Sequence, residues 1–340
     1  MILQSVHDPA EASSVAQRLH TALAEPLEIE GHQIKIDASI GIALGDDPRL
    51  LLKEADAAMY RAKSHPGLGF AFFDPDLDEA ALVRFRRIAE LGDAVDRDEF
   101  ILHYQPIVTL ASGATDGYEA LIRWQHPALG ELAPLEFIPL AEECGQIVPI
   151  GRWVLREACC HIARLGESAG RVFEIAVNVS ARQLQHPDFV THVEDALRES
   201  GLAPEQLVLE ITESVVIDTG DVETRLALLK QRGVQLALDD FGTGYGSLAY
   251  LQKLPVDIVK IDRSFTATID EENGGEPLLR AIIGLGSALG TRLVAEGIER
   301  VTQSDLVTTL GCERAQGFHY GRPSAMQSFD VTGVTRGASS

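Results

Sequence analysis

The sequence predicts an α/β protein whose larger part is a (β/α)8 barrel of the TIM kind, preceded by a small, partial α/β fragment. Three observations support this prediction. Strand and helix patterns alternate from Glu99 onward, which is typical of parallel strands joined by crossover helices. About eight strands fit into that length, the number that such a barrel needs. Most of these strands end in acidic or amide residues, as the strands of barrel enzymes do at the face that carries their chemistry.

Composition bounds the class of protein. The chain has 340 residues, 45% of them hydrophobic, which suffices for one large domain and a smaller companion. With 51 acidic against 29 basic residues the formal net charge is -22, so a DNA-binding or membrane-surface protein, which needs a basic face, is not expected. The sequence has no apolar run long enough to cross a bilayer, and we expect a soluble, cytoplasmic chain without direct membrane contact. A longer parent protein could still carry an anchor upstream.

The first part of the chain predicts a small set of helices and strands. Residues 8–24 have apolar positions at helical spacing after Asp8-Pro9, which indicates an amphipathic helix. Isoleucines alternate in a predicted strand from His32 to Leu44, a second helix is expected over 50–63, and a short strand over 67–73. This set is too small and too open-edged to form a stable domain alone.

Several motifs in this part carry a family resemblance. Ser39-Ile-Gly-Ile-Ala43 and Met59-Tyr-Arg-Ala-Lys63 resemble the closing third of a GGDEF domain, the fold of bacterial diguanylate cyclases. We assign residues 1–75 to this fragment. The Gly-Gly-Asp-Glu-Phe turn that carries metal and guanosine triphosphate in that family is absent, so the resemblance implies no cyclase activity. Lys63 matches a phosphate-contacting lysine of the family, but we interpret it as a solvated residue at a helix end.

The remaining chain divides into a connecting helix over 76–97, a barrel over 98–330 and a flexible tail over 331–340. The predicted strands lie near 100–108, 116–122, 173–178, 206–211, 234–239, 256–261, 292–296 and 314–318. The predicted helices lie near 134–144, 147–166, 188–200, 222–232, 246–252, 276–289 and 300–309.

Two adjacent acids, Asp239 and Asp240, end a buried strand and precede a glycine-rich turn. Two like charges this close raise each other's pKa unless a cation neutralises them, so either a metal ion or a shared proton is expected. Gly242, Gly244 and Gly246 permit backbone conformations that other residues resist.

Other strands end in residues that would meet these two acids. The set is Glu119, Asn178, Glu210, Glu213, Lys260, Glu296 and Gln316. Any one of them could be a surface residue, but strand ends converge on one face of a barrel, and seven strands in succession, counting the one that ends in Asp239 and Asp240, predict a site. Carboxylate and amide oxygens without His or Cys favour Mg²⁺ or Mn²⁺. Asp239 could bridge two ions, an arrangement that recurs in phosphodiester hydrolysis, and Lys260 would add a positive charge or orient the attacking water.

The same residues lie in motifs that resemble an EAL domain, the family that hydrolyses cyclic di-GMP to linear pGpG. The resemblance runs from about Asp98 to Pro323. Its motifs, in family order, are Tyr104-Gln-Pro-Ile107, Tyr118-Glu-Ala-Leu-Ile-Arg-Trp124, Asn178-Val-Ser180, Glu210-Ile-Thr-Glu213, Asp239-Asp-Phe-Gly-Thr-Gly-Tyr245, Lys260-Ile-Asp262, Ala295-Glu-Gly-Ile-Glu299 and Gln316-Gly317. One departure is Gly246, which stands where serine is more common and removes no expected ligand.

The resemblance implies a role for each matching residue. It places a first metal ion at Glu119, Asn178, Glu210 and Asp239, and a second at Asp239 and Asp240. Glu296, Lys260 and Asp240 are the catalytic residues that it implies, and Glu296 and Lys260 match residues that act on the nucleophilic water. Glu213 matches one that steadies the loop after the fourth strand. Expected substrate contacts are Gln105, Leu121, Arg123, Asp262, Glu299 and Gln316. For Asp262 and Glu299 the alternative, solvated loop acids, stays open.

The leading hypothesis is a metal-dependent cyclic di-GMP phosphodiesterase that carries two Mg²⁺ or Mn²⁺ ions. The family resemblance further implies a homodimer formed through the barrel. The main alternative is a non-catalytic cyclic di-GMP receptor or protein-interaction module, but such domains usually lose acids from this set and none is lost here. A barrel enzyme acting on another phosphate ester is the third possibility.

Overall fold

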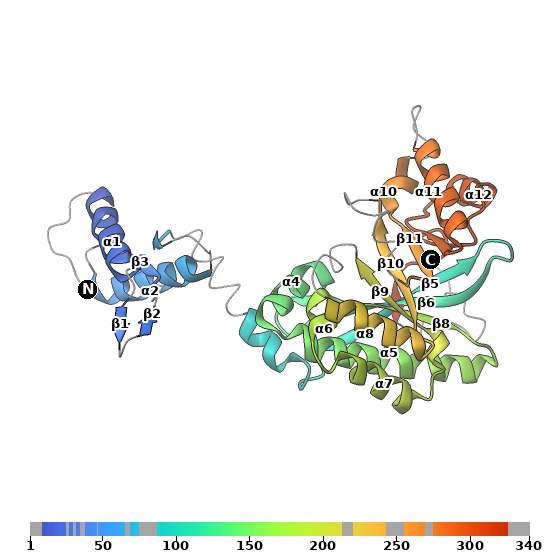
Figure 1. Ribbon diagram of the computed structural model, residues 1–340, viewed down its shortest axis with the longest axis horizontal. Helices are drawn as coiled ribbons and strands as arrows, with labels where there is room; N and C mark the ends of the chain where they lie inside the picture. The colour runs from blue at the N-terminus through green and yellow to red at the C-terminus, as the bar shows by residue number, and fades with distance from the viewer. Residues whose placement is uncertain are drawn as a thin grey trace. The chain divides into compact units, whose positions relative to one another are not determined.

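The structure, a computed structural model, describes residues 9–24, 27–29, 32–34, 38–45, 47–64, 69–74, 87–212, 220–242, 255–268 and 275–325 (Figure 1). The chain divides into two compact units, Met1–Glu90 and Leu91–Ser340. Each unit has its own helices and strands and is described separately.

The first unit contains two helices and two small sheets. In chain order its elements are α1 (Pro9–Ala24), β1 (Leu27–Ile29), β2 (His32–Ile34), β3 (Ile40–Ile42), α2 (Pro48–Ser64) and β4 (Phe70–Phe72). The strands β1 and β2 form an antiparallel hairpin, whereas β3 and β4 pair in parallel. Both predicted helices and the predicted strand near 67–73 are confirmed.

The single strand predicted from His32 to Leu44 is wrong. Its first part, β2, pairs with β1, and its later part, β3, pairs with β4, while Ala38 and Ser39 between them carry no strand. The two halves therefore belong to different sheets. At Gly41 in β3, a Cβ atom would lie 1.8 Å from the Ala55 carbonyl oxygen, so glycine is what lets α2 pack directly onto β3.

The second unit is built around a closed barrel. Its eight strands are β5 (Phe100–Thr109), β6 (Ala114–His126), β8 (Glu174–Asn178), β9 (Leu207–Thr212), β10 (Gln235–Phe241), β11 (Ile258–Ile261), β12 (Arg292–Ala295) and β13 (Arg314–Gln316). They follow one another around the barrel in the order β5-β13-β12-β11-β10-β9-β8-β6, and pairing of β5 with β6 closes the ring. The predicted barrel and its strands are confirmed.

The expectation that all strands run parallel is wrong for β5. This strand is antiparallel to both of its neighbours, β6 and β13. The cause is the short link over 110–113 between β5 and β6, because a parallel neighbour needs a crossover of a dozen or more residues. Strand β6 also continues to His126, where it pairs with β7 (Gly130–Leu132), so Glu119 lies in the middle of a strand and not at its end.

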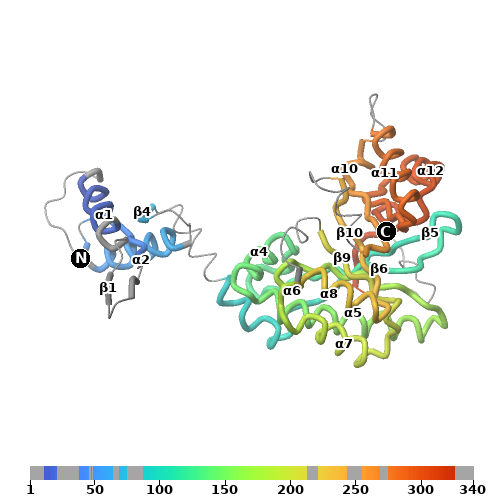
Figure 2. Tube along the Cα trace, viewed as in Figure 1, coloured from blue at the N-terminus to red at the C-terminus, as the bar shows by residue number. Residues whose placement is uncertain are grey.

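Helices cover the outside of the barrel. They are α4 (Pro134–Cys144), α5 (Ile147–Ala169), α6 (Ala181–Gln185), α7 (Phe189–Ser200), α8 (Gly220–Gln231), α10 (Arg263–Ala267), α11 (Glu276–Leu289) and α12 (Val301–Thr309). In Figures 1 and 2, α5, α7 and α8 lie together on one side of the strands, and α5 packs on both α7 and β8. Six predicted helices are confirmed, and the one predicted over 246–252 lies outside the described residues. Two further short elements of the described chain are η1 (Pro204–Gln206) and β14 (Ser324–Ala325).

The interior of the barrel is filled in layers. A middle layer is apolar and consists of Ile107, Ala176, Val208, Ala237, Ile258 and Val294. The space that these residues share with Glu210 and Lys260 above and with Glu174 and Arg314 below amounts to only about 20 Å³. The barrel is therefore a packed core without a pore, and its interior has no room for a ligand between its two ends.

The cysteines and the length of the helices complete the description. Cys144, Cys159, Cys160 and Cys312 are free thiols. In the part of the chain that the structure describes, none of the helices is both long enough and apolar enough to cross a membrane.

Candidate active site

The candidate site lies one step above the apolar layer, at the carboxyl ends of the parallel strands. Side chains alternate along a strand, so residues two positions apart point to the same side. Two positions beyond the apolar layer, this places a polar residue in the barrel mouth on every parallel strand that contributes to that layer. These residues are Asn178, Glu210, Asp239, Lys260 and Glu296. On the reversed strand β5 the same step leads back from Ile107 to Gln105.

Lys260 is the centre of this layer. Its side chain is 2% exposed, yet its ammonium lies near four carboxylates. Nζ is 2.7 Å from Glu210 Oε1, 2.8 Å from Glu296 Oε1, 3.3 Å from Asp239 Oδ1 and 3.6 Å from Glu119 Oε2. One buried cation therefore holds four predicted site acids together.

Amide side chains orient Glu119 from the other side. Asn178 Nδ2 donates to Glu119 Oε1 at 2.7 Å, and Gln316 Nε2 donates to Glu119 Oε2 at 2.6 Å and to Gln105 Oε1 at 3.0 Å. Gln105 in turn donates to the Gly321 carbonyl oxygen at 3.2 Å. Gln105, Glu119 and Gln316 are all buried, so this network fixes the carboxylate in one orientation.

Burial and neighbouring charges shift the pKa values of the site acids in different directions. Burial raises the pKa of Glu210 well above its ordinary value, and the nearby Glu119 adds to this. Burial also raises the pKa of Glu296, to about 7. Glu119 behaves differently: burial alone would raise its pKa, but Lys260 and the hydrogen bonds from Gln316 and Asn178 bring it below its ordinary value. Burial would lower the pKa of Lys260, but the four acids raise it, so the lysine stays charged.

The adjacent acids Asp239 and Asp240 lie at the rim of this layer. Asp239, Asp240 and Glu296 each offer an oxygen within 4.8 Å of the others. Asp240 has a φ of 54° and Gly242 a φ of 98°, so the backbone passes through left-handed conformations at the end of β10. This conformation is unfavourable for aspartate. The left-handed conformation of Asp240 brings its carboxylate back toward Asp239.

The donor set fits a hard divalent cation. Among the described residues, Glu210 Oε2 is buried without a hydrogen-bond partner of standard geometry, and Asp239 Oδ1 accepts no hydrogen bond although Lys260 lies 3.3 Å away. An unpaired buried carboxylate oxygen is unfavourable. Of the predicted metal ligands, Asp239 and Asp240 lie in the group with Glu296. Glu119 and Glu210 lie beside Lys260, and Asn178 donates to Glu119. The group of Asp239, Asp240 and Glu296 offers only oxygen donors, as Mg²⁺ and Mn²⁺ prefer.

Predicted substrate contacts on β6 line the mouth above the acids. Leu121 and Arg123 have the same parity as Glu119 and so point to the same side of the strand. The guanidinium of Arg123 donates to the Ile122 carbonyl oxygen at 2.8 Å, and its Nε lies 3.8 Å from Glu131 Oε1. Glu131 was not predicted from the sequence, since it lies on β7, a strand too short to show a pattern.

Other predicted residues are not brought into this cluster. Asp262 is the N-cap of α10, where Oδ1 accepts from the Ser264 amide at 3.0 Å. Glu299 is exposed, and its backbone amide donates to Gln303. Glu213, Gly244 and Gly246 lie outside the described residues.

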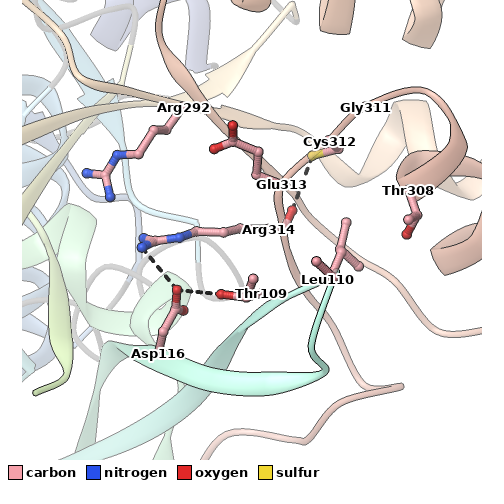
Figure 3. A pocket seen from close by; sticks show the side chains of 10 residues that line it. Thr109, Leu110, Asp116, Arg292, Thr308, Gly311, Cys312, Glu313 and Arg314 are labelled. Atoms are coloured by element: carbon pink, nitrogen blue, oxygen red, sulfur yellow. Dashed lines mark hydrogen bonds and ion pairs between the residues drawn. The ribbon is translucent and has the colours of Figure 1, made fainter. Parts of the chain in front are cut away.

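A cavity of about 490 Å³ lies at the opposite end of the barrel (Figure 3). Arg292 and Arg314 begin their strands there, and Arg314 forms an ion pair with Asp116 at 3.0 Å. Thr109 donates to the same carboxylate at 2.7 Å. None of the predicted site residues lines this cavity, so it is separate from the candidate active site.

Comparison with known proteins agrees with the geometry. Residues 88–323 match the EAL domain family, and residues 1–67 match the diguanylate cyclase GGDEF domain. The bifunctional diguanylate cyclase/cyclic di-GMP phosphodiesterase MucR of Pseudomonas aeruginosa is 40% identical over 95% of this chain and 48% of its own length. The cyclic di-GMP phosphodiesterase PdeR of Escherichia coli is 33% identical over 97% of this chain and 50% of its own length. The chain thus spans about half the length of these curated relatives.

Solved structures give the same result. One described as "PaMucR Phosphodiesterase, c-di-GMP complex" is 41% identical with a TM-score of 0.67, covering 71% of this chain and 98% of that one. The EAL enzyme Bd1971, in its cAMP and cyclic di-GMP bound form, is 28% identical with a TM-score of 0.71, covering 83% of this chain and 75% of that one. The family match covers most of the chain, and the relatives share its barrel. The chain therefore belongs to the EAL domain family.

Proposed function

We propose that this chain hydrolyses cyclic di-GMP to linear pGpG with the help of divalent metal ions. The observation that carries the proposal is the buried Lys260 among Glu119, Glu210, Asp239 and Glu296 at the mouth of the barrel. The names of MucR and PdeR, and the bound nucleotide of the PaMucR structure, support cyclic di-GMP as the substrate.

The domain boundaries follow from this proposal. We assign residues 98–330 to the phosphodiesterase and 1–75 to a GGDEF-like fragment without cyclase activity. Residues 76–97 would connect the two, and 87–94 within them are helical. The flexible tail over 331–340, the homodimer and the cytoplasmic location stay predictions.

Two ions, Mg²⁺ or Mn²⁺, would be held by the acids that the barrel brings together. Glu119, Asn178, Glu210 and Asp239 would hold the first ion, and Asp239 with Asp240 the second. Such ions activate a water for attack and stabilise the leaving oxygen of a phosphodiester. Glu210 Oε2 and Asp239 Oδ1, both buried and without a hydrogen bond among the described residues, support this assignment.

The other residues would act through charge and position. Lys260 supplies a fixed positive charge beside the reacting phosphate, where a dry environment strengthens its effect. Glu296, with a pKa of about 7, is able to accept a proton near neutral pH, as a general base must. Arg123 would bind a phosphate with its fork of donors. Gln105 and Gln316 keep Glu119 in place.

The deciding experiment is incubation of the purified chain with cyclic di-GMP and Mg²⁺ or Mn²⁺, with pGpG followed by chromatography. We expect pGpG to form and a chelator to prevent it. Tight nucleotide binding without pGpG, while a known phosphodiesterase works in parallel, would identify a receptor and contradict the proposal. Turnover of generic phosphoesters at the same rate would indicate a different barrel enzyme.

Glu119→Ala tests the metal ligands. We expect turnover to fall by at least about 100-fold, because ligand loss removes charge stabilisation worth several kcal/mol. Binding of cyclic di-GMP should survive in part through Arg123 and Gln105. Glu167→Ala, an exposed acid on α5, is the matched control and should keep its activity. Retained turnover in Glu119→Ala would exclude Glu119 as a ligand.

A further inference from the structure

A carboxylate lies beside the arginine that is proposed to bind the substrate phosphate. Glu131 Oε1 is 3.8 Å from Arg123 Nε, and its other oxygen, Oε2, accepts from Gln125 Nε2 at 2.9 Å. In the register of β6 and β7, Glu131 is directly opposite Gln125. Gln125 has the same parity as Arg123 and Glu119, so all these side chains share the mouth side of the barrel.

Glu131 is not part of the acid cluster around Lys260. Arg123 is four residues beyond Glu119 along β6, which separates the two Cα atoms by roughly 13 Å. The Glu131 side chain is 40% exposed, against 16% for Arg123 and 2% for Lys260. A part-exposed carboxylate of this kind is held weakly and is able to move aside when another anion arrives.

Within the described residues, little besides Arg123 offsets the charge of Glu131. His103 Nε2 lies 3.7 Å from Glu131 Oε2, but burial lowers the pKa of His103, so the imidazole is neutral at neutral pH. Gln125 donates a hydrogen bond but carries no charge. An anion that reaches Arg123 therefore meets the Glu131 carboxylate as its competitor.

We infer that Glu131 sets the affinity of the site for phosphate-bearing ligands by competing with them for Arg123. The inference rests on the proposed function, in which Arg123 binds a substrate phosphate. It predicts that Glu131 weakens binding of cyclic di-GMP and weakens binding of pGpG still more. The linear product carries a terminal phosphate and one more negative charge than the substrate, so the competing carboxylate favours product release.

The test is the Glu131→Gln variant, which keeps the shape and the acceptor for Gln125 but removes the charge. Binding of cyclic di-GMP and of pGpG is titrated in chelator, where metal-dependent turnover does not interfere. We expect about two- to fivefold tighter binding of cyclic di-GMP, the range of a part-exposed ion pair, and a larger gain for pGpG. With metal present, KM should fall while kcat stays equal or drops, with stronger product inhibition.

Two controls separate this role from a general charge effect. Glu167→Gln changes the net charge equally, near the far end of α5, and should leave both affinities unchanged. In an Arg123→Met background, Glu131→Gln should give no gain, because the group it competes for is gone. The same gain in that background would overturn the mechanism.

Failure of this inference is distinct from failure of the proposed function. Unchanged or weaker binding in Glu131→Gln would show that Glu131 merely positions Arg123 and would overturn the inference even if the chain turns over cyclic di-GMP. A wild-type chain that binds without turnover, with tighter binding in Glu131→Gln, would reject the enzyme and keep the inference. If the wild-type chain binds neither nucleotide, both proposals fail.

Discussion

Lys260 neutralises a group of acids that would otherwise repel one another in a buried site. We predict that Lys260→Met lowers the unfolding free energy of the metal-free chain by about 3–5 kcal/mol, the usual loss when one partner of a buried ion pair is removed. Added Mg²⁺ or Mn²⁺ should recover part of this loss, because the acids then regain a cation. The stabilisation by metal should therefore be larger in the variant than in the wild type.

Thermal unfolding with metal and with chelator measures both quantities. Lys230→Met is the control, since Lys230 forms an ion pair with the part-exposed Asp257 outside the site. The loss of unfolding free energy in Lys230→Met should be smaller than in Lys260→Met and independent of metal. An equal metal-induced shift in Lys260→Met and the wild type would contradict the role assigned to Lys260.

Glu296 should make the metal-free chain less stable as the pH rises. Its pKa is about 7 in the folded chain against an ordinary 4.5, so the folded state holds a proton that the unfolded state releases. The stabilisation is complete below pH 4.5 and is lost progressively up to about pH 7. Unfolding in chelator between pH 5 and 8 measures this. The decline should be shallower in Glu296→Gln, and an equal slope in both proteins would refute the assignment.

Residue identity predicted the acid cluster better than it predicted the surrounding contacts. Asn178, Glu210 and Lys260 lie within buried strands or at their last residue, so the pleat alone brings them together above the apolar layer. Asp262 has the same sequence context, yet the local start of α10 uses its side chain as a cap. Glu131 contacts Arg123 only because β7 folds back on β6, and no short-range pattern encodes that pairing.

Elements were predictable wherever a pattern was long enough. The helices α4, α5 and α11 have long apolar faces, and their observed bounds lie within three residues of the predicted ones. The direction of β5 could have been deduced, because the link over 110–113 is too short for a crossover. The interruption between β2 and β3 could not, since alternation of side chains does not reveal that two halves pair with different strands.

Tyr104 links β5 to helix α5, and removal of its hydroxyl should lower stability without changing catalysis. Its neighbour Gln105 points into the mouth, so Tyr104 points outward, where its hydroxyl lies 2.6 Å from His161 Nδ1 on α5. Tyr104→Phe should lower the unfolding free energy by about 1–3 kcal/mol, because the part-buried imidazole loses its partner. Denaturant unfolding and kcat check this. Unchanged stability, or a large fall in kcat, would contradict the outward role.

In the described strands, the charges inside the barrel lie at its two ends. The mouth holds the acids and Lys260, the middle is apolar, and the far end holds the ion pairs of Glu174. The apolar layer separates the two charged groups and leaves only about 20 Å³ between them. Because each end is stabilised by its own contacts, the far end is able to change without altering the mouth.

Glu174 at the far end links strands that are distant in sequence. Its carboxylate lies 3.0 Å from Arg292 on β12 and 2.5 Å from Arg314 on β13, which brings β8 together with the last strands of the barrel. Both arginines lower the pKa of Glu174 although burial alone would raise it. The carboxylate therefore stays charged, and its two ion pairs link β8 to β12 and β13 across the barrel.

Glu174→Gln should weaken the contacts with Arg292 and Arg314 and lower stability without affecting catalysis. We expect the unfolding free energy to fall by about 1.5–3 kcal/mol, the range for hydrogen bonds to charged groups. The metal-induced stabilisation and kcat should stay at the wild-type values, because the apolar layer lies between this end and Lys260. Glu313 is an exposed acid that lines the same cavity. The control variant Glu313→Gln should change neither the unfolding free energy nor kcat. A fall in kcat of Glu174→Gln at a temperature where the variant remains folded would show that the two ends are coupled through the barrel.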